Sequence, residues 1–335
     1  VTIYESAPAA GGWLRYGIPE YRLPKSILDA EIKLMCANGM KIETGIELGK
    51  DIKLSNLVKD YDAVYLALGA QMAVPMRVKG SNLQGVYLGV DFLKNFALGY
   101  KPQIGKKVAV VGGGNTAIDC ARTAIRLGSD VTIIYRRTRK EMPAEAYEVD
   151  AADEEGIKFY MLTNPVEFIG EGEKLQSVKL EKMELGEPDA SGRRSPQPTG
   201  EFFSEKFDTV IAAISQQPDV DFLAEDEHKI NGRILPLSKW RTAEVDENTM
   251  YTGIENLFAG GDFRRGPATA IEAIADGRIS AEMIDRFLRK IPVGLLKAKF
   301  DSKKAQKLKE ISVAEYEQYP KINRYKMPEI EAKER

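Results

Sequence analysis

The stretch KKVAVVGGGNTAIDCARTAIRLGSDVTIIYRR, residues 106–137, predicts a strand, a tight turn, a helix and a second strand. Residues 108–111 are small or β-branched apolar residues, as expected of a strand that is buried on both faces. Apolar positions within 118–125 give the helix one apolar face, and Gly128 ends it before the β-branched residues 131–135. This order is typical of the first half of a dinucleotide-binding unit, so we predict an α/β fold built on a parallel sheet.

Three small residues follow the first strand with the spacing of a phosphate-binding turn, GxGxxA. Gly112 allows a sharp turn, Gly114 leaves room for a pyrophosphate beside the backbone, and Ala117 lets the helix pack close to the sheet. The free N–H groups and the positive dipole end of the helix then favour the phosphates. An ordinary glycine turn is the alternative, but the complete strand, turn and helix favour a bound dinucleotide.

Basic residues stand at the end of the second strand, where an NAD site usually has Asp or Glu to accept from the ribose 2′-hydroxyl. Here the strand ends in Arg136 and Arg137, and Arg139 and Lys140 follow closely. A guanidinium group suits a 2′-phosphate by its charge and by its two-point hydrogen bonding. The sequence therefore favours NADP(H) over NAD(H), with an exposed basic turn as the alternative.

The composition narrows the class of protein. The 335 residues suffice for two domains, and 43% apolar with 29% charged residues is ordinary for a globular protein. The net charge of -2 gives no argument for nucleic acid or a membrane surface as partner, and no apolar run is long enough to span a bilayer. No secretory signal is visible, and we expect a cytoplasmic protein.

Few side chains could carry redox or metal chemistry. Cys36 and Cys120 form no CxxC, which argues against an iron–sulfur cluster held by this chain alone and against a redox disulfide. His228 is the single histidine, so we expect neither a histidine-based metal site nor a catalytic triad. We therefore predict that a cofactor carries the chemistry, with no catalytic side chain and no metal ligand.

The beginning of the chain predicts part of a second dinucleotide unit. Residues 1–4 form an apolar strand that ends in Glu5, as in a unit that holds an unphosphorylated ribose. The strand and glycine turn that should precede it are absent, so we expect the sequence to be cut from a longer protein. Residues 11–24 form an ordered loop of Gly, Pro and large apolar groups, which lies along a planar cofactor or packs on its own aromatics. The similar strands at 61–67 and 207–213 also suggest two related domains.

The segment before the last long helix carries another candidate cofactor site. A short strand at residues 256–259 leads towards Gly261 and Asp262, and a long helix follows. Asp262 can accept from a sugar hydroxyl, and the helix start at Ala268 and Thr269 can present N–H groups to an electron-rich oxygen. The alternative for Asp262 is an ordinary turn acid.

Five motifs occur in the order of a known family. They are GGWLRYGIPEYRLPK at 11–25, GGGNTAIDCA at 112–121, YRRTRKEMPA at 135–144, ISQQPD at 214–219 and AGGDFRRGPATAIEAIADGR at 259–278. Together they resemble the flavoprotein small subunit of NADPH-dependent glutamate synthase. They also resemble the corresponding domains of dihydropyrimidine dehydrogenase and of NADH-dependent ferredoxin:NADP oxidoreductase. The resemblance runs from Val1 to about Leu288.

The resemblance implies two interleaved, Rossmann-like domains of the glutathione-reductase-like type. A discontinuous FAD-binding domain would comprise residues 1–100 and 240–288, and an NADP(H)-binding domain, residues 101–239, would be inserted into it. Residues 289–335 form a lysine-rich tail outside the resemblance.

The resemblance also implies the cofactor contacts. For FAD, the matching residues are Glu5, Gly12, Trp13, Arg22, Leu48, Gly69, Gly261, Asp262 and Thr269. For NADPH, the pyrophosphate loop matches Gly113, Gly114, Asn115 and Thr116, and the 2′-phosphate site matches Arg136 and Arg137.

Two parts of the family pattern are missing from this sequence. They are a cysteine-rich domain with [4Fe–4S] clusters and the glycine loop of the FAD site, both expected before Val1; in addition, Ser215 stands where the family usually has Gly. The resemblance implies that hydride passes from NADPH to FAD and that electrons leave through iron–sulfur clusters in the missing region or in a partner. That partner would be a large catalytic subunit or a ferredoxin-type electron acceptor.

Two other functions stay open. One is a ferredoxin- or hydrogenase-linked electron carrier, with or without bifurcation, which would differ only in its partners. The other is a nucleotide-binding scaffold without turnover. A disulfide reductase is disfavoured because the chain has no CxxC.

Overall fold

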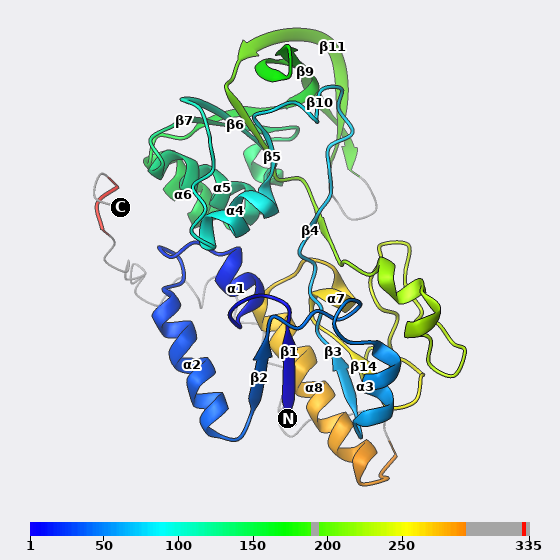
Figure 1. Cartoon of the computed structure of the whole chain (residues 1–335). Helices are drawn as coiled ribbons and strands as arrows, with labels where there is room; N and C mark the ends of the chain where they lie inside the picture. The colour runs from blue at the N-terminus through cyan, green and yellow to red at the C-terminus, as the bar shows by residue number, and fades with distance from the viewer. Residues whose placement is uncertain (189–193, 293–329, 333–335) are drawn as a thin grey trace, which may run out of the picture.

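The computed structural model describes residues 1–188, 194–292 and 330–332, and these form an upper and a lower unit (Figure 1). The upper unit contains a five-stranded sheet in the order β5–β12–β6–β7–β8, in which every neighbouring pair is parallel. Its strands are β5 (Val86–Leu88), β12 (Thr209–Ala212), β6 (Lys107–Val111), β7 (Asp130–Tyr135) and β8 (Lys158–Met161). The predicted strand, turn, helix and strand are confirmed as β6, α5 (Asn115–Arg126) and β7.

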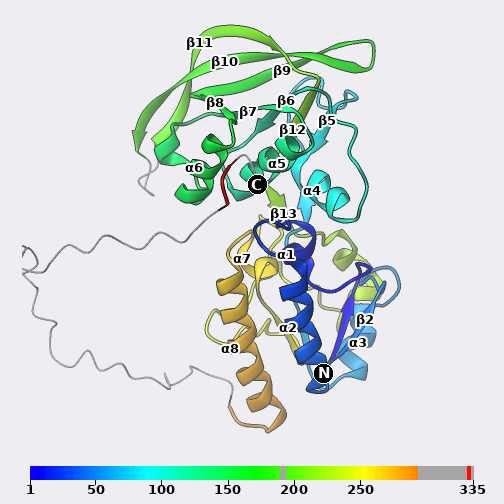
Figure 2. The ribbon, with the colours of Figure 1, turned by 90° about the vertical axis from the view of Figure 1, so that its left-hand side faces the viewer.

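Helices cover one face of this sheet, and a second sheet covers the other (Figure 2). The helices are α4 (Gly89–Ala97), α5 and α6 (Ala146–Glu154), and the second sheet is antiparallel with β9 (Thr163–Glu171), β10 (Lys174–Pro188) and β11 (Arg194–Lys206). On β6, Val108 and Val110 pack with the helices, while Ala109 and Val111 pack with the antiparallel sheet. The strand is therefore buried on both faces, as predicted.

The lower unit has two separate pairs of parallel strands. β1 (Thr2–Glu5) pairs with β2 (Lys41–Thr44), and β3 (Val64–Leu66) pairs with β14 (Leu257–Ala259). Its helices are α1 (Gly12–Tyr16), α2 (Lys25–Ala37), α3 (Leu54–Asp60), α7 (Asp262–Arg265) and α8 (Ala270–Leu288). Because β3 and β14 are neighbours, segments from before and after the upper unit build the lower one.

The chain passes between the units twice at one place (Figure 1). β4 (Met72–Ala73) and β13 (Gln216–Gln217) pair antiparallel there, with Gln216 opposite Ala73. The upper unit, residues 74–215, is thus an insertion. The first crossing lies before the expected boundary at residue 100, because β5 and α4 already belong to the upper unit. The second lies before the expected boundary at residue 239, because Leu223 and Leu235 already pack in the lower core.

The remaining helical segments are single 3₁₀ turns. They are η1 (Arg139–Glu141), η2 (Asp221–Ala224) and η3 (Asp226–His228). Leu223 of η2 packs with Leu257 in the lower core, which also places this part of the chain in the lower unit. Among the described helices, none is long and apolar enough to cross a membrane. Most of the expected tail, residues 293–329 and 333–335, lies outside the described residues.

We expect Leu180→Ala to destabilise the upper unit because Leu180 is 0% exposed between the two sheets. Removal of a buried leucine side chain costs about 2–5 kcal/mol. The control Leu34→Ala removes the same atoms from α2, where Leu34 is 60% exposed, and should change the free energy of unfolding by less than about 0.5 kcal/mol. Urea unfolding measures both variants, and equal losses would contradict the packing of the two sheets.

Candidate functional site

The turn between β6 and α5 requires glycine at two positions. Gly112 has a φ of +145°, and a Cβ there would lie 2.3 Å from the carbonyl oxygen of Ala213. A Cβ on Gly113 would lie 2.5 Å from the ring of Tyr135. The turn is therefore pressed against the carboxyl ends of the central strands, as a dinucleotide-binding turn must be.

Gly114 is different because it borders open space. A Cβ there would meet its nearest neighbour, Pro143, only at 3.8 Å. Gly114 is also the N-cap residue of α5, and no side chain caps the helix. The first turn of a helix has N–H groups without intrahelical partners, so an anion beside Gly114 would accept their hydrogen bonds.

The side chains of the loop make hydrogen bonds within the protein. Asn115 Oδ1 accepts from the backbone N–H of Glu145 at 3.1 Å, where α6 begins. Thr116 Oγ1 lies 2.9 Å from Nε2 of Gln216, on the crossing strand β13. Ala117 is fully buried against the sheet. These contacts fix the loop and leave its backbone amides for a phosphate.

The basic turn after β7 contains one uncommitted guanidinium. Within the described ranges, Arg136 is exposed and makes no hydrogen bond or ion pair. Arg137 is half-buried, and its Nε donates to the carbonyl oxygen of Arg194 at 2.8 Å. The guanidinium nitrogens of Arg139 lie 2.7 and 3.2 Å from carboxylate oxygens of two residues of α6. Arg136 is thus the most available of these arginines for a 2′-phosphate.

Three of the residues expected at FAD lie near one another at the top of the lower unit. A Cβ on Gly12 or on Gly69 would in each case lie 3.6 Å from Nε2 of Gln71. Both glycines have positive φ, +51° and +70°, so their loops can approach this amide closely. Trp13 is the second residue of α1, directly after Gly12, and packs against the core of the upper unit.

Two other expected FAD residues have local partners. The carboxylate of Glu5, at the end of β1, accepts from the backbone N–H of Ala7 at 2.8 Å. Leu48 forms a bridge with Ile52 and packs against the lower core.

The segment after β14 gathers the remaining expected residues. Gly261, with a φ of +64°, donates its N–H to the buried carboxylate of Asp276 at 3.0 Å. Asp262 begins α7; burial raises the pKa of its carboxyl, and a hydrogen bond from the N–H of Ala268 opposes the rise. Thr269 caps α8, with its Oγ1 accepting from the N–H of Glu272. The N–H of Ala268 therefore donates to Asp262, and the Thr269 hydroxyl is committed to its helix.

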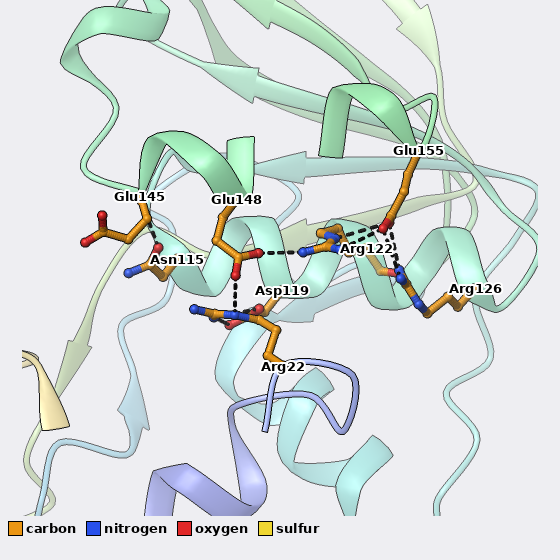
Figure 3. Close-up of polar contacts among 8 residues, drawn as sticks. All are labelled: Arg22, Asn115, Asp119, Arg122, Arg126, Glu145, Glu148 and Glu155. Atoms are coloured by element: carbon orange, nitrogen blue, oxygen red, sulfur yellow. Dashed lines mark hydrogen bonds and ion pairs between the residues drawn. The ribbon is translucent and has the colours of Figure 1, made fainter. Parts of the chain in front are cut away.

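Arg22 lies against the upper unit (Figure 3). Its Nη1 donates to both carboxylate oxygens of Asp119, at 3.0 and 2.8 Å, and its Nε lies 2.7 Å from Oε1 of Glu148. Burial raises the pKa of Asp119 to about 6, although the attraction of Arg22 opposes the rise. The guanidinium that the resemblance assigned to FAD is thus paired with carboxylates of α5 and α6.

Ion pairs continue from there along α5. Arg122 pairs with Glu148 and with Glu155, the latter at 2.7 Å, and Arg126 pairs with Glu155 at 2.8 Å. The guanidinium carbons of Arg122 and Arg126 lie 4.6 and 4.0 Å from the ring centre of Tyr21. We call the six charged residues the ion-pair row: Arg22, Asp119, Glu148, Arg122, Glu155 and Arg126.

Sequence reasoning did not single out three residues that support the site. Gln71 and Gln216 flank the two crossings, and their contacts join segments that are distant in the chain. Asp276 accepts from Gly261 and pairs with Arg265 at 2.6 Å. For Asp276 a signal existed, because a carboxylate within the apolar stretch IEAIAD of a helix needs buried partners.

A cluster of metal-ligand type also occurs among the described residues. Glu225, Glu227 and His228 bring ligand atoms within 4.8 Å of one another. His228 is buried, however, and its Nδ1 accepts from the N–H of Leu54 at 3.2 Å. A neutral imidazole with an accepting Nδ1 carries its proton on Nε2, which then has no lone pair for a metal. We therefore assign no metal to this cluster.

The fold and the site define a class of protein, an α/β oxidoreductase with two units. One unit contains a dinucleotide-binding turn, and the other is discontinuous in sequence and is also of a nucleotide-binding type. The family model described as pyridine nucleotide-disulphide oxidoreductase matches residues 3–277. The chain belongs to this family, and membership implies FAD and NAD(P)H as cofactors. The expected fold class is confirmed.

Three relatives illustrate the similarity. The chain is 44% identical to the NADP(+)-dependent formate dehydrogenase subunit beta of Moorella thermoacetica, 41% identical to the NADPH-Fe(3+) oxidoreductase subunit beta of Geobacter sulfurreducens, and 35% identical to the glutamate synthase [NADPH] small chain of Azospirillum brasilense. Each match covers 86% of this chain, but only 40%, 46% and 62% of the respective relative. The expected resemblance to the glutamate synthase small subunit is confirmed.

Solved structures share the fold at low sequence identity. Mycobacterium tuberculosis FprA in complex with NADPH gives a TM-score of 0.71 at 19% identity, over 86% of this chain and 78% of that one. The thioredoxin reductase of T. acidophilum gives a TM-score of 0.62 at 21% identity, and the match covers 86% of this chain and 90% of that one.

We expect Gly114→Ala to weaken NADP⁺ binding by about tenfold or more, because the added methyl occupies the space beside the α5 amides. The fold should tolerate it, since Gly114 has a φ of -92° and no atom closer than 3.8 Å to the new Cβ. The matched variant Gly112→Ala should lower the melting temperature instead. Calorimetric titration and thermal unfolding measure these effects; unchanged binding in Gly114→Ala would contradict the site.

We expect Glu155 to stabilise the fold in a pH-dependent manner. Burial raises the pKa of its carboxyl, but hydrogen bonds from Arg126 and Arg122 outweigh this and hold the pKa below its ordinary value. A lowered folded-state pKa gives stability that is present above about pH 4.5, the ordinary value, and is lost as the pH falls through the folded-state pKa.

Glu155→Gln should therefore lose about 2–4 kcal/mol of unfolding free energy at pH 7, because two guanidinium groups lose their charge partner. The difference in unfolding free energy between this variant and the unmodified protein should become smaller as the pH falls from 5 towards 3.5. Urea unfolding at several pH values in this range measures the difference. A difference that does not vary with pH would refute the stabilising role of the Glu155 carboxylate.

Proposed function

We propose that this chain binds NADPH and FAD and is the part of an oxidoreductase that passes hydride from NADPH to the flavin. One observation supports this most strongly: the uncapped start of α5 at Gly114 lies one strand away from the free guanidinium of Arg136. The first suits a pyrophosphate and the second suits a 2′-phosphate.

The names of the relatives support NADPH as the nucleotide. The names of the three relatives described above all contain NADP(H), whereas the other reactant in each name differs. This chain matches only 40–62% of their lengths, which fits a shared NADPH-using part attached to different partners. The alternative, an exposed basic turn after β7, predicts no preference for the 2′-phosphate.

The chemistry supplied by the two cofactors is hydride transfer from nicotinamide to flavin. The chain contributes position and charge. The amides at Gly114 would hold the NADPH pyrophosphate, and Arg136 its 2′-phosphate. Asp262, fixed by the N–H of Ala268, would accept from a hydroxyl of FAD. No acid or base side chain is required, because the residues act by positioning.

For the whole protein, we favour the glutamate synthase small-subunit type. Electrons would leave through [4Fe–4S] clusters in a preceding region or in a partner, which would be a large catalytic subunit. The five motifs in family order support this assignment. A ferredoxin- or hydrogenase-linked carrier is the second candidate, because the identity is higher, at 41–44%, to the formate dehydrogenase and Fe(3+) oxidoreductase subunits. The cytoplasmic location stays a prediction.

We expect the protein, after incubation with FAD and removal of the excess, to retain a flavin absorbance that NADPH bleaches under anaerobic conditions. NADH should bleach it much more slowly. Retained flavin without bleaching by either nucleotide would favour the scaffold alternative over an enzyme.

Arg136→Ala should weaken NADP⁺ binding by about tenfold and leave NAD⁺ binding nearly unchanged, because only the 2′-phosphate loses a partner. The matched control is Arg139→Ala, since Arg139 lies in the same turn and is already paired with Asp150 and Asp153. Calorimetric titration with both nucleotides measures the selectivity. Equal losses for both nucleotides in Arg136→Ala would refute the 2′-phosphate assignment.

A further inference from the structure

The loop between α1 and α2 is a stiff part of the lower unit. The Nζ of Lys25 donates to the carbonyl oxygens of Leu14, Ile18 and Leu23, at 3.0, 2.7 and 2.8 Å. A lysine ammonium has three donors, so all of them are used to hold this loop. Arg22 projects from this fixed loop, and its position therefore follows the position of α1.

The partners of Arg22 belong to the upper unit. Asp119 lies on α5, one turn after the loop residue Asn115, and Glu148 lies on α6. The side chains of Asp119 and Glu148 are 5% and 7% exposed, and that of Arg22 is 18% exposed. Low exposure makes these ion pairs far less screened than surface pairs. Arg22 thus joins the loop beside Gly12 to the helix whose start forms the nucleotide loop.

The ion-pair row balances its charge only when the units are together. Three guanidinium groups face three carboxylates, and Arg22 is the one member from the lower unit. A shift of the units that moved Arg22 away but kept water out of the contact would leave Asp119 buried without its guanidinium partner. An unpaired buried carboxylate is costly, so the ion-pair row favours one relative placement of the units.

We propose that Arg22 is a positioning residue, which sets the placement of the two units through Asp119 and Glu148. This inference rests on the proposed function, in which the lower unit holds FAD and the upper unit NADPH. Hydride transfer requires the two reacting rings to lie in contact with the correct orientation. A guanidinium suits the task because its fork can engage two carboxylates at fixed angles, which an ammonium cannot.

The first test measures the placement without any cofactor. Spin labels are attached at Lys33→Cys on α2 and Lys158→Cys on β8, two exposed positions, in a Cys36→Ser background; Cys120 is fully buried. Double electron–electron resonance then reports the distance distribution between the units. Arg22→Ala should broaden or shift this distribution, and Arg22→Lys should do so less.

The matched control is Arg15→Ala. Arg15 comes from the same segment and its side chain is 17% exposed, but its partners, Asp29 and the carbonyl oxygen of Ala10, belong to the lower unit. Its distance distribution should match that of the unmodified protein. An unchanged distribution in Arg22→Ala would overturn the proposal.

The second test separates positioning from flavin binding. In the FAD-loaded protein, Asp119→Asn, which weakens the pairing with Arg22 from the α5 side, should keep the flavin content and change the Kd for NADPH less than about threefold. The rate of flavin reduction at saturating NADPH should fall about 10–100-fold, and the long-wavelength charge-transfer absorbance of the nicotinamide–flavin pair should weaken. Arg22→Ala should lower the rate of flavin reduction to a similar extent.

The outcomes distinguish the two levels of inference. Loss of flavin from Arg22→Ala with an unchanged distance distribution would make Arg22 a flavin contact and overturn the positioning role. The opposite result is also informative. If Arg22→Ala broadens the distance distribution but NADPH does not reduce the flavin of the unmodified protein, the proposed function is refuted, while Arg22 still joins the units.

Discussion

The antiparallel pairing of β4 with β13 is the constraint on which the rest of the structure depends. Because Gln216 lies opposite Ala73, the chain leaves and re-enters the lower unit at a single point. The nucleotide loop is tied to that point, since Gln216 also donates to the hydroxyl of Thr116. The two units therefore meet at the carboxyl ends of the central strands, where open α/β sheets bind their ligands.

Two paired strands of two residues each cannot by themselves fix the relative orientation of the units, and further contacts do so. Trp13 packs on the core of the upper unit, and Arg22 pairs with Asp119 and Glu148. Apolar contact tolerates sliding, whereas a guanidinium between two buried carboxylates has few equivalent positions. Desolvation offsets much of the energy of buried ion pairs, so we assign the ion-pair row to specific placement more than to net stability.

The nucleotide loop could be predicted from sequence because its determinants are local. Gly112 must have a positive φ, Gly114 must lack a side chain, and both lie within one strand–turn–helix segment. The environment of Arg22 could not be predicted, because Asp119 lies 97 positions further along the chain. The same holds for Gln216 and Thr116, which are 100 positions apart. The resemblance to a family assigned Arg22 to FAD, but it gave no signal of the ion pairs with α5 and α6.

The sequence by itself determined the alternation of strands and helices, the position of the glycine turn and the basic end of β7. These features follow from periodicity and from backbone limits that act over a few residues. The tertiary structure decided which arginine stays free, where the chain crosses between units, and that the guanidinium of Arg22 faces α5 and α6. Those outcomes depend on which distant side chains meet in space, and burial and charge pairing across the two units settle them.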